Sequence, residues 1–141
     1  MTEATVPSLL YSVKQVELAT RARLDDLLKP SGVTALQYTA LTVLERRDNM
    51  SSAELARNSF VTPQSMSDLV GALERRGLVV KSPDPLSKRR QVISLTDAGR
   101  ALLDLHAPAV QALEDEMLTG FTARERSAFR DYLNRSRAAL G

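Results

Sequence analysis

The chain has 141 residues, of which 43% are hydrophobic and 26% charged, a composition typical of one soluble globular unit. It contains no cysteine, which excludes disulfides, thiolate metal sites and redox sensing through thiols. The N-terminal segment 1–8 lacks the basic and apolar regions of a signal peptide, and no apolar run approaches the roughly 18 residues that span a bilayer. We therefore expect a cytoplasmic protein without a membrane partner.

The net charge of +2 is small, but it is distributed unevenly. The stretch 57–90 carries a local charge of +4, which leaves the rest of the chain near −2. A local excess of cations is typical of a surface that faces phosphates. The basic residues of this stretch are Arg57, Arg75, Arg76, Lys81, Lys88, Arg89 and Arg90, and its acidic residues are Asp68, Glu74 and Asp84.

Residues 9–28 form the first predicted helix, since their leucines and valines recur with a period near 3.6 residues. Ser8 can cap its start, and Pro30 with Gly32 ends it. Thr34 then caps a second helix whose apolar positions are Leu36, Ala40, Leu41, Val43 and Leu44.

Two capping boxes mark the next helix starts, because a hydroxyl at the cap and a Glu or Gln three residues later satisfy each other's backbone N–H groups. Thr34 with Gln37 is the first box, and Ser51 with Glu54 is the second. The second box opens a short third helix over residues 52–58.

Thr62 and Pro63 open a fourth helix, since proline at the first helical position loses no hydrogen bond. Arg75, Arg76 and Gly77 end it with cations in the last turn and a glycine after it. Its apolar stripe consists of Met66, Leu69, Val70 and Leu73.

The pattern then changes to two strands, predicted at residues 78–81 and 91–95. Pro83 and Pro85 favour a loop over residues 83–90. This loop places the cations Lys88, Arg89 and Arg90 at the tip of a hairpin, or wing.

Two helices follow the hairpin: a long fifth one from residue 98 to about 118, and a sixth that Thr122 and Glu125 open with a third capping box. Apolar residues nearly encircle the fifth helix, and a helix that is apolar on most sides is buried on most sides. Since one protomer offers few partners for so much apolar surface, we predict a homodimer. The apolar residues of the fifth helix are Leu102, Leu105, Ala109, Val110, Leu113 and Met117, and those of the sixth are Phe129, Tyr132, Leu133 and Leu140.

The element order predicts a mainly α fold with a small β-hairpin: a winged helix-turn-helix plus a helical dimerisation region. We assign residues 34–95 to the DNA-binding domain and residues 1–33 and 96–141 to dimerisation. The turn 59–61 between the third and fourth helices lacks the glycine that is common there.

The start of the fourth helix suits the major groove of DNA, because its side chains are polar and mostly short. The residues expected to face base edges or phosphates are Thr62, Gln64, Ser65, Ser67 and Asp68. Capping of an exposed helix start is the alternative role for Gln64 and Ser65.

The wing cations Lys88, Arg89 and Arg90 suit a narrow minor groove, whereas the alternative is a solvated charged loop. We expect phosphate contacts from Arg75, Arg76 and Lys81. For the two arginines the alternative is capping of their own helix.

These residues resemble the MarR-type regulators, over residues 33–105 by motif and over the whole chain by helix order. The resemblance is carried by the motifs LERRGLV at 73–79, SPDP at 82–85, Arg89, and LTDAG at 95–99. It implies an obligate homodimer that represses or activates transcription from a pseudo-palindromic operator, often under the control of a small phenolic or aromatic acid.

By motif, Arg89 matches the family's arginine at the wing tip, and Gln64, Ser65 and Ser67 match its DNA-reading positions. Two positions depart from the pattern. Ser87 stands where an acid usually orients the wing arginine, with Asp84 as a substitute, and Asp68 stands where a basic or neutral residue is common. Asp68 is expected to accept from a cytosine amine or to pair with an arginine.

The resemblance also implies a ligand pocket between the dimer helices and the reading head. Tyr11, Arg21 and Tyr38 are the candidates for aromatic and carboxylate contacts, against core packing of the tyrosines and a solvated Arg21. We expect no cofactor and no metal site, since the single histidine, His106, lacks nearby ligands and favours a packing or interface role.

Two other classes of function were considered. An enzyme is disfavoured because the sequence shows no phosphate-binding glycine loop, nucleophile elbow or His/Cys/carboxylate cluster. A winged helix that only contacts proteins is the alternative to specific DNA binding, and steep salt dependence of DNA affinity separates the two.

Overall fold

The computed structural model describes residues 5–141, except the side chain of Lys88. Capping side chains set where its helices begin. Helix α1 spans Leu9–Leu28 after Ser8, and a 3-10 turn, Lys29–Ser31, follows it. The three predicted capping boxes are confirmed in both directions, at the starts of α2 (Ala35–Arg46), α3 (Ser52–Ser59) and α6 (Ala123–Leu140). Thr62 and Thr96 cap α4 (Pro63–Arg75) and α5 (Asp97–Met117).

A two-stranded antiparallel hairpin lies between α4 and α5. Strand β1 runs from Val79 to Asp84 and β2 from Ser87 to Leu95, with Val79 opposite Leu95 and Pro83 opposite Gln91. The predicted loop over 83–90 is therefore wrong: only residues 85 and 86 separate the strands. A hairpin of two strands has only edge strands, and there a proline can stand without breaking a ladder.

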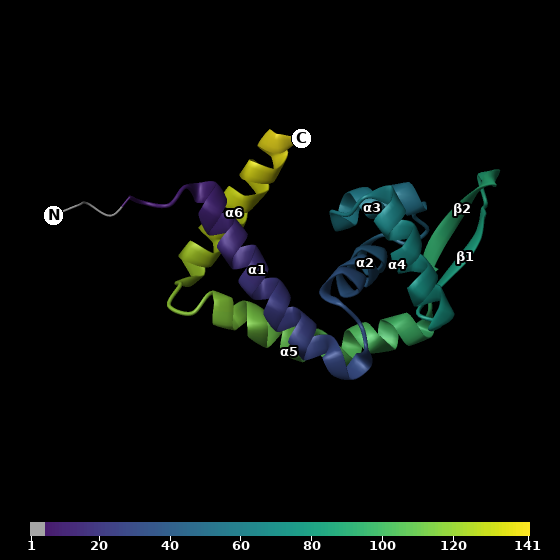
Figure 1. Cartoon of the computed structure of the whole chain (residues 1–141), viewed down its shortest axis with the longest axis horizontal. Helices are drawn as coiled ribbons and strands as arrows, with labels where there is room; N and C mark the ends of the chain where they lie inside the picture. Colours follow the sequence, from purple (N-terminus) through teal and green to yellow (C-terminus); the bar gives the residue numbers. More distant parts are fainter. Residues whose placement is uncertain (1–4) are drawn as a thin grey trace.

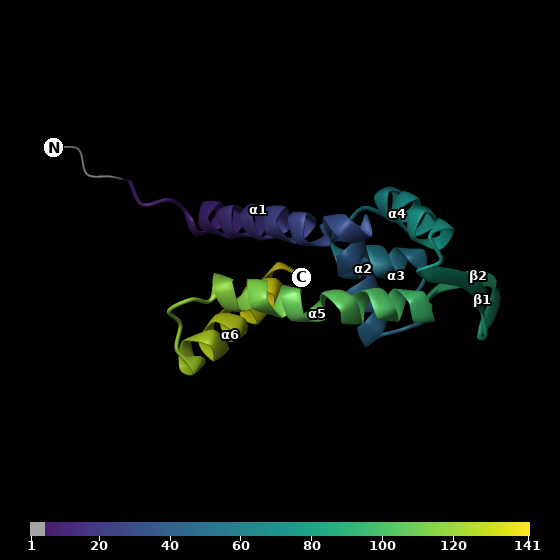
Figure 2. The same cartoon turned by 90° about the horizontal axis from the view of Figure 1, so that it is seen from below.

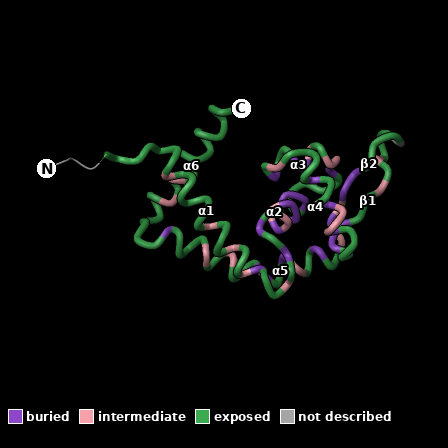
Figure 3. The backbone as a smooth tube through the Cα atoms, in the orientation of Figure 1, coloured by how far each residue is buried: buried purple, intermediate pink, exposed green. Residues whose placement is uncertain are grey.

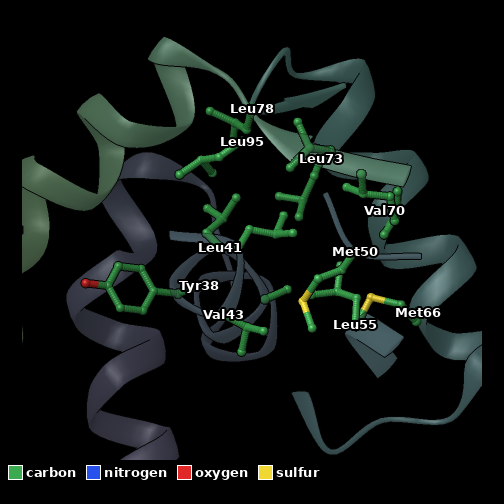
Figure 4. Packing of buried hydrophobic residues seen from close by; sticks show 14 of the residues in the cluster. Tyr38, Leu41, Val43, Met50, Leu55, Met66, Val70, Leu73, Leu78 and Leu95 are labelled. Carbon is green, nitrogen blue, oxygen red and sulfur yellow. The ribbon is translucent and has the colours of Figure 1, made fainter. Parts of the chain in front are cut away.

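Helices α2, α3 and α4 and the hairpin together form the head of the molecule. The hydrophobic core lies inside this head (Figure 4). Met66, Val70 and Leu73 of α4 are buried against it, whereas Leu69 is half-buried and Leu36 of α2 is exposed rather than part of the core. The core also takes in Leu28, Val33 and Leu103, from outside the stretch assigned to DNA binding.

The base of the wing is fixed to the loop between α2 and α3. The N–H of Ile93 donates to the carbonyl of Met50 at 2.7 Å, which adds a bridge beside β2. After the C-terminus of α4, Gly77 adopts a left-handed conformation with φ of 72°, as expected for a residue that ends a helix.

Helix α1, the C-terminal part of α5, and α6 form a helical arm. This arm and the head lie at opposite ends of the molecule (Figures 1 and 2). Helices α1 and α5 lie against each other, and Arg23 of α1 donates to both carboxylate oxygens of Glu116 of α5 at 2.8 and 2.7 Å. These bonds hold the pKa of the Glu116 carboxyl below its ordinary value. His106 of α5 packs inside the protomer, with its Nε2 2.6 Å from the hydroxyl of Ser31.

The arm exposes most of its apolar side chains (Figure 3). Among the described residues, Leu28 is the only buried member of α1, and α6 has none. Exposed apolar residues of the arm include Leu9, Leu10, Val13, Leu105, Met117, Phe121, Tyr132, Leu133 and Leu140.

Two helical glycines provide a stability test with a matched control. A Cβ at Gly99 would lie 2.4 Å from the backbone oxygen of Leu78 and 2.7 Å from a methyl of Leu95, so alanine cannot fit unless α5 moves. A Cβ at Gly71 would meet only the flexible guanidinium of Arg75, at 3.4 Å. Gly99→Ala should lower the free energy of unfolding by about 1–3 kcal/mol, whereas Gly71→Ala should raise it by up to about 1 kcal/mol.

Denaturant unfolding of both variants at one protein concentration measures this difference. A stabilising effect of Gly99→Ala would contradict the close approach of α5 to the end of α4.

Candidate nucleic-acid interface

Burial of one face of α4 leaves its other face on the surface of the head. Thr62 accepts a hydrogen bond from the N–H of Ser65 at 3.2 Å and donates to its hydroxyl at 3.0 Å. Gln64, Ser67 and Asp68 are exposed beside this cap. The five residues predicted to read DNA therefore all lie on the accessible start of α4.

The turn before α4 explains how the fold does without a glycine there. Phe60 takes the left-handed conformation, with φ of 63°, and its N–H donates to the carbonyl of Ala56. Its ring is 73% exposed, and the guanidinium of Arg137 from α6 lies 5.9 Å from the ring centroid.

The wing cations do not sit at the tip as predicted, because the hairpin turns earlier. The turn consists of Pro85 and the fully exposed Leu86, whose N–H donates to Asp84 at 2.9 Å. Lys88, Arg89 and Arg90 instead follow along β2, and the side chain of Lys88 lies outside the described residues.

Arg89 and Arg90 have different surroundings. Arg90 forms ion pairs with Glu54 of α3 and with Asp84 of β1. Arg89 lies between Ser87 and Gln91, where the strand pairing shifts: Ser87 lies opposite Asp84 and Gln91 opposite Pro83. Arg89 is exposed and has no ion pair within the described part of the chain.

The two arginines at the end of α4 also differ in their surroundings. Arg75 is exposed, as a phosphate contact requires. Arg76 donates instead to the carbonyls of Ser31 and Gly32, at 2.5 and 3.0 Å, and so satisfies the turn after α1. The guanidinium of Arg76 thus satisfies a neighbouring turn and does not cap its own helix, and the phosphate contact expected of it stays a prediction.

Lys81 of β1 lines a hollow of about 100 Å³ between α4 and the wing, together with Ser52, Ser67 and Gln91. Asp68 has no arginine partner among residues 5–141, which leaves its carboxylate free on the surface. Ser52 and Gln91 belong to no motif, so the sequence alone does not mark them as candidates.

A larger pocket, of about 430 Å³, lies where the arm meets the head. Arg21 lines it and is held by Glu17, one helical turn away, at 2.8 Å. Glu17 also lines the pocket, and the other lining residues are Thr20, Leu24, Ala35, Leu36, Thr39, Ser59 and Phe60.

Of the three ligand candidates only Arg21 lines this pocket. Tyr38 belongs to the core, and burial raises the pKa of its phenol. Tyr11 is exposed near the start of α1. Sequence reasoning missed Ser59, whose hydroxyl is buried without a hydrogen-bond partner among the described residues. A buried polar group is nearly always paired in a folded protein, so this hydroxyl has capacity for a bound molecule.

The described residues show neither a metal site nor a membrane span. No group of three or more His, Asp or Glu residues is arranged to hold a metal ion within 5–141. Over the same range, none of the helices is both long and apolar enough to cross a membrane.

Comparison with known proteins places these features among transcription regulators. A sequence model described as the MarR family matches residues 31–90. An HTH-type transcriptional repressor of Mycobacterium tuberculosis (strain H37Rv) is 33% identical over 133 residues, which cover 94% of each chain.

Solved structures share the fold. A MarR-family transcriptional regulator from Silicibacter pomeroyi superposes with a TM-score of 0.83 at 28% identity, over 93% of this chain and 88% of that one. The MepR protein of S. aureus, solved in complex with DNA, also gives a TM-score of 0.83, at 20% identity over 95% of this chain and 99% of that one. At that identity the likeness of MepR concerns the fold alone.

Proposed function

Because this chain belongs to the MarR family of transcription regulators, we propose that it represses transcription by binding a pseudo-palindromic operator as a homodimer, and that a small aromatic acid releases it. Family membership decides the class of activity: the protein is a DNA-binding transcription regulator and not an enzyme. Repression is supported by its M. tuberculosis relative, which is named a repressor.

The observation that carries operator binding is the exposed polar start of α4 beside a wing that presents Arg89. A helix start of this kind fits the major groove, where glutamine can form two hydrogen bonds with adenine. An arginine on a projecting hairpin fits the narrow minor groove, which attracts cations. Both side chains are exposed, and Arg89 has no ion pair within the described residues.

The alternative is a winged helix that contacts only proteins. Asp68 favours it, since an acid beside phosphates weakens DNA binding. The free cations Arg75 and Arg89 favour DNA. Affinity for operator DNA that falls steeply with salt supports DNA binding, because each neutralised phosphate releases counterions.

Substitutions at Gln64 and Arg89 test the two proposed contacts. Gln64→Ala should weaken operator binding by about 1–3 kcal/mol and relax the preference at one base pair. Arg89→Ala should weaken binding. It should also reduce the salt slope, which is the fall of log affinity with log salt concentration, by roughly 0.9, the value for one neutralised phosphate. Fluorescence anisotropy with operator DNA over a salt series measures both effects.

The exposed residues Gln111 of α5 and Arg46 of α2 provide matched controls. Gln111→Ala and Arg46→Ala should bind the operator like the wild type. Wild-type affinity in both Gln64→Ala and Arg89→Ala would refute the proposed contacts.

The homodimer is supported by the arm. Helices as long as α1 and α6 need an apolar face packed against something, because isolated helices are marginal in water. Within residues 5–141 no residue of α6 is fully buried, and the first turns of α1 carry exposed leucines. A second copy supplies matching apolar surface. It also supplies a second reading helix, for a half-site about 34 Å away along the duplex.

A charge placed in the arm should separate the protomers. Leu10→Glu and Leu133→Glu should each convert a dimer into a monomer in sedimentation velocity, because a buried unpaired carboxylate is costly. Leu86→Glu, on the exposed wing turn, is the matched control and should stay dimeric. A monomeric wild type at micromolar concentration would rule out the dimer.

Ligand control is supported by the pocket between arm and head. Its volume suits a ligand with one aromatic ring. Arg21 offers a cation whose ion pair with Glu17 a ligand carboxylate would replace, Leu24 and Phe60 offer apolar contacts, and Ser59 offers an unpaired hydroxyl. Phe60 stands two residues before the cap of α4, so occupancy of the pocket can move the reading helix.

Benzoate is a suitable probe, with benzyl alcohol as its uncharged counterpart. Benzoate at saturation should weaken operator binding by about 5- to 150-fold, the range of a coupling free energy of 1–3 kcal/mol. Arg21→Met should abolish this effect and Arg46→Met should retain it. An equal response to benzyl alcohol, or an unchanged response in Arg21→Met, would contradict a carboxylate bound at Arg21.

A further inference from the structure

One carboxylate of α3 lies at the centre of a charge cluster that reaches the wing. Glu54 closes the capping box of α3, with Oε1 accepting from the backbone N–H of Ser51 at 3.4 Å and from its hydroxyl at 3.1 Å. Its Oε2 accepts from Arg47 at 2.7 Å, and Oε1 forms an ion pair with Arg90 of β2. The side chain of Glu54 is only 16% exposed, so water weakens these ion pairs less than at an open surface.

Arg90 also reaches the turn of the wing. Its Nε lies 3.7 Å from Oδ2 of Asp84, and Oδ1 of the same carboxylate accepts from the N–H of Leu86. Arg90 therefore joins the turn of the hairpin to the start of α3. We call these two ion pairs the Arg90 link.

The wing needs such a link because a two-stranded hairpin is marginally stable by itself. The bond between Ile93 and Met50 fixes only the base of the hairpin. Ser87 can supply no carboxylate from the wing to orient an arginine. The Arg90 link joins the outer half of β2, which also contains the neighbouring Arg89, to α3.

We propose that Glu54 is a positioning residue for the wing: through Arg90 it holds the hairpin so that Arg89 enters the minor groove. Arg90 is then a structural cation and not a phosphate contact. This inference rests on the proposed operator binding, and it assigns to α3 a role in how the wing reads DNA.

The competing interpretation makes Arg90 a phosphate contact, as the sequence suggested. On that interpretation Glu54 and Asp84 oppose binding, because they neutralise a cation that DNA would use. The two interpretations predict opposite effects when the charge of Glu54 is removed.

Glu54→Gln is the decisive variant. The amide keeps the capping box, as Gln37 does beside Thr34, but it weakens the bond to Arg90. If Glu54 positions the wing, the variant should bind the operator roughly tenfold more weakly, a size usual for coupled charged neighbours. Equal or tighter binding would overturn the proposal.

Hydroxyl-radical footprinting adds a readout that loss of stability alone would not move. Glu54→Gln should lose protection in the minor groove at the wing and keep protection where α4 binds. Arg47→Gln is the matched control, since it breaks the other ion pair of the same carboxylate, and its footprint should equal that of the wild type. Uniform loss of protection in Glu54→Gln would refute a role confined to the wing.

The salt slope tests Arg90 directly. Arg90→Gln should weaken binding without lowering the slope, whereas loss of a phosphate contact would lower it by roughly 0.9. In a double-mutant cycle, Glu54→Gln together with Arg90→Gln should cost little more than either alone. A lowered slope, or additive losses, would overturn the link.

Hydrogen exchange in the free protein separates this inference from the proposed function. Glu54→Gln should speed exchange of the amides of residues 87–91 and leave those of α4 unchanged. If the wild type binds no DNA, operator binding fails, yet this exchange result still decides whether the Arg90 link holds the wing. Unchanged exchange would refute the link.

Discussion

The burial of one face of α4 is the constraint on which the rest of the reading head depends. Met66, Val70 and Leu73 recur at helical spacing and are buried in the core. Once they are buried, the helix has no rotational freedom left, and Gln64, Ser67 and Asp68 must face solvent. The groove-reading surface is thus a consequence of packing, and its chemistry can vary without cost to the core.

Electrostatics in this head is decided by which arginines the protein itself uses. Arg76 satisfies the carbonyls of the turn after α1, and Arg90 joins the wing to α3. Both guanidiniums thus have partners within the protein. Arg75 and Arg89 remain exposed. The arginines of the head therefore fall into two groups, those with partners inside the protein and those open to solvent.

The arm and the head meet around Phe60. This residue lines the pocket with Arg21, takes a left-handed backbone, and lies beside Arg137 of α6. A bulky residue in that conformation costs free energy and persists only where its surroundings fix it. Thr62, the cap of α4, follows two residues later, so the pocket, the arm and α4 meet at this position.

Local patterns alone determined the helix starts and the order of elements, because a capping hydroxyl and its partner lie three residues apart. The MarR resemblance and the reading positions on α4 follow from the same local patterns. Only the tertiary structure decided how far the strands run, since Pro83 is acceptable where a hairpin has nothing but edges. It also decided the partners of Arg76 and Arg90, the unpaired hydroxyl of Ser59 and the core position of Tyr38. These depend on segments distant in the chain, whose meeting no spacing rule encodes.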